Sequence, residues 1–63
     1  MYITGYRAGV KTIDAISAVK KHTGKSLLES KRLVEDALEG KPVQLPDDFV
    51  LREDLEDLGF RLS

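Results

Sequence analysis

The two ends of the chain alternate in the manner of β-strands. The residues of 2–8 that share one face are Tyr2, Thr4 and Tyr6. Ile3 lies on the opposite face, and the aromatic side chains favour a strand here. Gly5 inside this run predicts a β-bulge or a close approach of another backbone segment. At the other end, residues 60–62 alternate apolar and polar side chains, which predicts a short final strand.

Between these ends the apolar spacing becomes helical. Residues 13–22 carry apolar side chains at three- and four-residue intervals, with Thr12 as the expected N-cap and Gly24 as the terminator. The segment Ser26 to Glu29 is a capping box that begins a second helix, and Leu27 belongs to its apolar stripe. Because so few residues join the two helices, we expect a helical hairpin.

A third helix follows a proline-containing connection. Two prolines restrict residues 41–46 to an edge strand or an extended connector. Asp47 and Asp48 then open the helix as cap and first-turn acid. Its core-facing residues are Leu51, Leu55 and Leu58. Phe49 and Val50 fit either the helix or the segment before it.

These elements, in the order β-α-α-β-α-β, predict an α+β fold with the helices packed on one face of a small three-stranded sheet. With 63 residues, the chain forms a single domain, 1–63. The absence of cysteine excludes disulfides and thiolate metal sites. No apolar run is long enough to span a membrane and no signal peptide is present, so we expect a cytoplasmic protein.

The charge is strongly divided between the two halves of the chain. Residues 1–32 carry seven bases and two acids, whereas residues 33–63 carry three bases and nine acids. One interpretation is that two solvated faces attract each other within the molecule. The other is that a basic patch attracts an acidic partner.

No set of residues has the pattern of an active site. Ser26 and Glu29 are explained as a helix cap, and His22 as a surface residue near a helix C-terminus. The acidic residues between 47 and 57 lack the spacing of a calcium loop. We therefore predict no catalytic residue, no cofactor and no metal site, and a function other than that of an enzyme.

Residues 13–35, IDAISAVKKHTGKSLLESKRLVE, resemble the C-terminal domain of the bacterial ribosomal stalk protein, ribosomal protein L seven/twelve. The matching positions are Ile13, Ile16, Val19, Lys20, Thr23, Gly24, Leu27, Glu29, Lys31, Leu33, Val34 and Glu35. Weaker similarity extends over nearly the whole chain. The resemblance implies the fold of that stalk head, which a bacterial protease adaptor shares, and this fold has the element order expected above.

The resemblance also implies a protein-binding function. In the stalk family the first two helices recruit translational GTPases: elongation factors G and Tu, initiation factor two and release factor three. The partner-binding positions carried over are Ile13, Ile16, Lys20, Gly24, Leu27 and Lys31. Independently of the family, a short apolar groove rimmed by lysines suits an acidic, amphipathic protein segment.

Some features depart from the family pattern. Thr12 and Ser17 stand where the family has lysines, and Lys25 and Ser26 replace a leucine and a glycine of the turn. The chain also begins directly before the first strand, without the dimerisation helix and hinge that tether a stalk protein. We therefore expect a freestanding head that acts as a mimic, competitor or regulator, with a phage origin among the alternatives.

Two other functions remain open at this stage. The basic half of the chain would also suit nucleic acid, with Tyr2 and Tyr6 as residues on which bases could stack. Alternatively, so small a core gains stability from neighbours, which would suit a subunit of an oligomeric assembly.

Overall fold

The computed structural model describes all residues from 1 to 63 and contains three helices and three strands. In chain order the elements are β1 (Tyr2–Tyr6), α1 (Thr12–Thr23), α2 (Leu27–Leu38), β2 (Val43–Gln44), α3 (Phe49–Leu58) and β3 (Phe60–Leu62). The expected order β-α-α-β-α-β and the α+β class are confirmed. None of the three helices combines the length and the apolar character that crossing a membrane requires.

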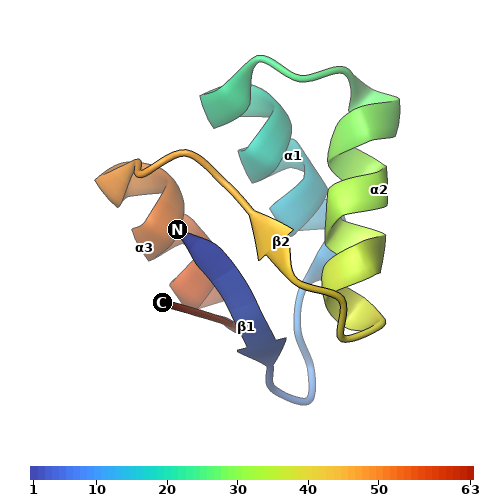
Figure 1. The fold of residues 1–63 in the computed structure, drawn as a ribbon, viewed down its shortest axis with the longest axis vertical. Helices are drawn as coiled ribbons and strands as arrows, with labels where there is room; N and C mark the ends of the chain where they lie inside the picture. The colour runs from blue at the N-terminus through green and yellow to red at the C-terminus, as the bar shows by residue number, and fades with distance from the viewer.

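β1 is the central strand of an antiparallel sheet with the order β2-β1-β3. Ile3 pairs with Val43 on one side and with Leu62 on the other, so the three apolar side chains project to the same face. Figure 1 shows the helices gathered on one side of this sheet. At the open end of the β1–β3 pair, Tyr2 and Ser63 exchange two backbone hydrogen bonds, each 3.0 Å long.

The bulge predicted at Gly5 is present, and it changes the direction of Tyr6. The register between β1 and β3 shifts just before Gly5, which places Tyr6 opposite the buried Phe60. The two rings meet edge-on with centroids 6.4 Å apart, and the Tyr6 hydroxyl donates a hydrogen bond to the Leu38 carbonyl at 3.0 Å. The prediction that Tyr2 and Tyr6 share a face is therefore wrong, because the extra residue of a bulge reverses the alternation that follows it.

The core lies between the sheet and the helices, and every element contributes to it. Its buried apolar residues are Ile3, Ala15, Val19, Val34, Ala37, Val43, Leu45, Leu51, Leu55 and Phe60. α2 contacts β1 and β2, α3 contacts β3, and α1 contacts the other two helices but no strand. α1 therefore lies between α2 and α3, which do not touch each other (Figure 1).

The helix starts follow the local signals with two exceptions. Asp47, the expected cap of α3, lies before that helix. Asp48 caps α3, because its carboxylate accepts hydrogen bonds from the amides of Val50 and the next residue at 3.0 and 3.1 Å. Thr12, the expected cap of α1, is instead the first residue inside that helix. Lys11 is the N-cap residue, and its side chain makes no capping hydrogen bond. The Lys11 amide donates to the Leu58 carbonyl at 3.0 Å, so the start of α1 is set by a contact with the end of α3.

Replacing Ser30 by alanine is expected to raise the free energy of unfolding by about 1 kcal/mol. Ser30 is completely buried in α2, and its hydroxyl has no hydrogen-bond partner. Alanine removes this unpaired group and has a higher helix propensity. The measurement is urea denaturation followed by circular dichroism. The matched control is Ser17→Ala on the exposed side of α1, which gains the propensity alone. A loss of stability at Ser30 would show that its hydroxyl has a partner in solution.

Candidate functional site

The connection between α1 and α2 is tightly determined by local hydrogen bonds. Gly24 adopts the left-handed conformation with φ 71°, and its amide donates to the Lys20 carbonyl at 3.0 Å. Thr23 donates its hydroxyl to the Val19 carbonyl at 2.6 Å. The expected cap is present as well, since Ser26 accepts the Glu29 amide at 3.1 Å. The hairpin therefore has a defined geometry, and its side chains keep fixed relative positions.

α1 exposes a stripe that lies away from α3. A shallow hollow of 230 Å³, lined by Asp14 and Ala18 of α1, marks the side of α1 that faces α3. Ile13, Ile16 and Lys20 follow each other at intervals of three and four residues, so they occupy the other side, toward α2. Ile13 is 78% exposed, Lys20 is exposed, and Ile16 is half-buried against the core. Of the apolar residues expected on this helix, only Ala15 and Val19 are therefore fully buried in the core.

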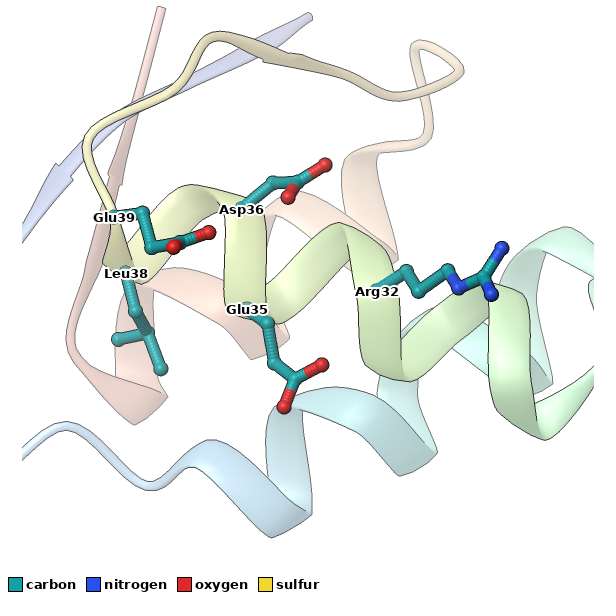
Figure 2. Close-up of a pocket in the computed structure, with 5 residues that line it drawn as sticks. All are labelled: Arg32, Glu35, Asp36, Leu38 and Glu39. Atoms are coloured by element: carbon teal, nitrogen blue, oxygen red, sulfur yellow. The ribbon is translucent and has the colours of Figure 1, made fainter.

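α2 presents a second exposed stripe that borders the first. Leu27 and Lys31 are both exposed, Leu27 by 60%, and helical spacing places them on one line with Glu35. Figure 2 shows the Glu35 side chain directed toward α1, so the line of Leu27 and Lys31 runs along the boundary between the helices. Of the apolar stripe expected on α2, Val34 and its neighbours form the packed face, whereas Leu27 stays exposed at its edge.

These positions together form a surface that we call the hairpin face. It consists of Ile13, Ile16 and Lys20 of α1, Gly24 of the turn, and Leu27 and Lys31 of α2. The structure brings all six predicted positions to one hairpin, although none of them lines a hollow of the surface. The expected groove is thus an open face. Sequence reasoning missed Leu28, which is 59% exposed beside Leu27 and whose only signal was that it falls off the apolar stripe.

The ion pairs of the structure leave the lysines of the hairpin face free. They join the Met1 amine to Asp47, Lys41 to Asp36 and Glu39, and Arg52 to Glu56, and the His22 ring contacts Asp48 and Asp54. The hydrogen bond from the Met1 ammonium lowers the pKa of Asp47 below its ordinary value. No carboxylate of this chain lies within 4.0 Å of the amine of Lys20 or Lys31. Their charge is therefore available to another molecule.

His22 differs from its expected place on the surface. Its side chain is only 14% exposed, because it lies between the end of α1 and the start of α3. Nε2 is 3.0 Å from an Asp54 carboxylate oxygen, and Nδ1 is 3.7 Å from one of Asp48. His22 thus connects α1 to α3 on the side away from the hairpin face. The prediction of a surface residue is wrong because sequence spacing did not show that α3 begins beside it.

The largest hollow lies along α2 and has a volume of 450 Å³. Its lining residues, shown in Figure 2, are Arg32, Glu35, Asp36, Leu38 and Glu39. Glu35 and Asp36 point to opposite sides of the helix, and Lys41 lies 3.8 Å from Asp36 and 3.5 Å from Glu39. These acids therefore do not converge on a common point, and the hollow does not have the arrangement of a general acid and base around a substrate.

The structure leaves one of the two tyrosines free for stacking on the outer face of the sheet. Tyr2 is exposed there, whereas Tyr6 is held against Phe60 and bonded to the end of α2. The pair therefore does not form the double aromatic platform that single-stranded nucleic acid uses on a sheet. The hairpin face, with its exposed apolar side chains and unpaired lysines, is the stronger candidate site. Comparisons of the chain with protein-family models, with curated proteins and with solved structures found no match.

Proposed function

We propose that this protein is a non-enzymatic protein-interaction module that binds an acidic, amphipathic segment of a protein partner on its hairpin face. The observation that carries the proposal is the combination of Ile13 and Leu27, both mostly exposed, with two lysines that have no partner in the chain. Exposed apolar side chains next to unneutralised cations favour a partner with apolar anchors and carboxylates.

The resemblance to the stalk head supports a narrower version of this proposal. Translational GTPases are the partners that the resemblance implies, so we propose that the protein binds such a factor in the cytoplasm as a mimic or regulator of the stalk. The matching residues lie on a helical hairpin whose turn is at Gly24, which is compatible with the resemblance. The binding residues proposed are the six of the hairpin face.

Nucleic acid is the second candidate, because Lys20, Lys31 and their basic neighbours could contact phosphates. Such binding would weaken steeply with salt and would be indifferent to the apolar residues of the face. The protein proposal is favoured by Ile13 and Leu27, since neither side chain has a phosphate-binding group, and both would lie exposed beside a nucleic-acid backbone.

The double variant Ile13→Ala/Lys31→Glu is expected to weaken binding to purified elongation factor G at least about tenfold. It removes an apolar anchor and reverses one charge on the hairpin face. The measurement is isothermal titration calorimetry at low salt. The matched control, Tyr2→Ala/Arg61→Glu, removes an exposed apolar side chain and reverses a charge on the sheet instead. Circular dichroism establishes that both variants are folded.

Three outcomes separate the candidates. Loss of binding in the hairpin variant with retention in the control supports the GTPase proposal. Undiminished binding by the hairpin variant would exclude the hairpin face as the site. The nucleic-acid alternative would be favoured if the wild-type protein does not bind the GTPase but binds a single-stranded or duplex oligonucleotide with a steep salt dependence.

A further inference from the structure

The exposed side of α3 combines apolar side chains with carboxylates, whereas the hairpin face combines apolar side chains with lysines. Phe49 and Val50 belong to the first turn of this helix, which resolves the ambiguity of the sequence. Phe49 is 72% exposed and Val50 is also exposed, because the helix turns Leu51 and Leu55 into the core instead. Two such side chains at one helix start leave an apolar patch that the fold itself does not cover.

Carboxylates flank this apolar patch. Glu53 and Asp57 are exposed one and two turns beyond Phe49 along α3, and Asp57 also lines the hollow between α1 and α3. Neither carboxylate lies within 4.0 Å of a cation of this chain. We call Phe49, Val50, Glu53 and Asp57 the α3 face. It is the outer side of an acidic, amphipathic helix.

We propose that the α3 face of one copy of this protein docks on the hairpin face of a second copy. The inference rests on the proposed function, because it identifies a partner segment with the required apolar anchors and carboxylates. Phe49 and Val50 would pack on the exposed Ile13 and Leu27. The unpaired acids of the α3 face would meet the unpaired lysines of the hairpin face.

The contact has to be between molecules. α1 lies between α2 and α3, so α3 is separated from the α2 part of the hairpin face (Figure 1). α3 is anchored in the core by Leu51 and Leu55 and cannot reach the hairpin face of its own chain. Each copy thus offers two different, complementary faces, and such head-to-tail contacts build open chains or closed rings rather than symmetric dimers.

The size of the contact sets the strength of the association. A helix of 10 residues is about 15 Å long, so the buried area lies at the small end of specific interfaces. The association is therefore weak and is helped by charge, which salt screens over about 10 Å at 0.1 M. It would compete with another protein for the hairpin face only at high protein concentration.

Sedimentation velocity of the wild-type protein at low salt tests the inference. Between about 10 µM and about 1 mM we expect the mass to grow beyond that of a dimer, with at least about a tenfold weaker association at about 0.5 M salt. A single species of monomer mass at the highest concentration would overturn the inference. A species that stops at dimer mass and is insensitive to salt would also contradict it.

Charge exchange identifies the two faces. The variants Lys20→Glu/Lys31→Glu and Glu53→Lys/Asp57→Lys should each lose self-association, because each then has two faces of the same sign. An equimolar mixture should associate again, since the hairpin face of either variant is opposite in sign to the α3 face of the other. The sheet variant Tyr2→Ala/Arg61→Glu should associate like the wild type. Loss of association in the mixture as well would exclude this pairing of faces.

The same variants separate this inference from the proposed function. The Glu53→Lys/Asp57→Lys variant keeps the native hairpin face, so its affinity for elongation factor G should be unchanged at dilute concentration. If it binds the factor while the wild type never self-associates, only the head-to-tail contact is wrong. If the wild type self-associates as described but no factor binds, the GTPase is wrong as partner and the contact between copies stands.

Discussion

Replacing Leu51 by alanine is expected to remove about 3 kcal/mol from the free energy of unfolding. Leu51 is completely buried in α3 and belongs to the small core between helices and sheet. A domain of 63 residues has a total stability of about 3–9 kcal/mol, so this one substitution removes about a third of it or more. The chain has no cysteine and hence no disulfide that would compensate.

Thermal and urea denaturation followed by circular dichroism provide the measurement. Leu28→Ala is the matched control, because it makes the same chemical change on an exposed part of α2. We expect the control to change the free energy of unfolding by no more than about 0.5 kcal/mol. Equal denaturation midpoints for the two variants would mean that α3 does not pack on the core in the way described.

Replacing Gly59 by alanine is expected to lower the free energy of unfolding by about 3 kcal/mol. Gly59 ends α3 with φ 115°, a conformation that side chains disfavour, and an added Cβ would lie 3.1 Å from the Val10 Cα. The backbone there is held in place by two hydrogen bonds. The Gly59 carbonyl accepts one from the Arg7 amide at 2.9 Å, and the neighbouring Leu58 carbonyl accepts one from the Lys11 amide. The substitution therefore strains the place where the β1–α1 loop meets the end of α3.

The substitution Gly24→Ala separates the effect of the left-handed backbone conformation from that of a steric clash. Gly24 also has a positive φ, 71°, but an added Cβ there meets nothing within 4 Å. We expect this substitution to lower the free energy of unfolding by about 1 kcal/mol, because only the left-handed backbone conformation disfavours alanine there. Urea denaturation of both variants compares the two costs. Gly24→Ala as damaging as Gly59→Ala would show that the contact with Val10 contributes nothing.

Features that depend on neighbouring residues in the chain could be predicted from the sequence. The cap at Ser26, an aspartate cap at the start of α3 and the left-handed Gly24 are properties of a few consecutive residues, and all are present. The element order and the buried Leu51 and Leu55 follow from spacing within one segment. Local chemistry determines such features, so no knowledge of the fold was needed.

Features that depend on where a neighbouring element begins or ends could not be predicted. Ile13, Leu27 and Phe49 are all apolar, and all lie in the first turn of their helices, where they are mostly exposed. Periodicity assigns such a residue to an apolar stripe, but it does not show that the packing partner stops short of it. His22 illustrates the opposite case, since its surroundings come from α3, more than 20 residues later.

For the candidate surface, this distinction means that the sequence proposes the residues, whereas the structure gives their exposure. The spacing of Ile13, Ile16 and Lys20 places them on one stripe in either interpretation, core or surface. Only the arrangement of α1 between α2 and α3 decides that Ile13 is open to solvent while Ile16 is half-buried. The free charge of the lysines likewise follows from the positions of carboxylates far away in the chain.

The pairing of Tyr2 with Ser63 has a consequence for local order at the chain ends. Isolated termini usually fray independently, each at little cost. Here the two 3.0 Å hydrogen bonds join Tyr2 to Ser63. Release of Ser63 therefore frees one edge of Tyr2, while β2 and the bonds of Met1 to Leu45 and Asp47 still hold the start of β1. Segments from opposite parts of the sequence thus support each other's local order, and the start of β1 is the more firmly held of the two.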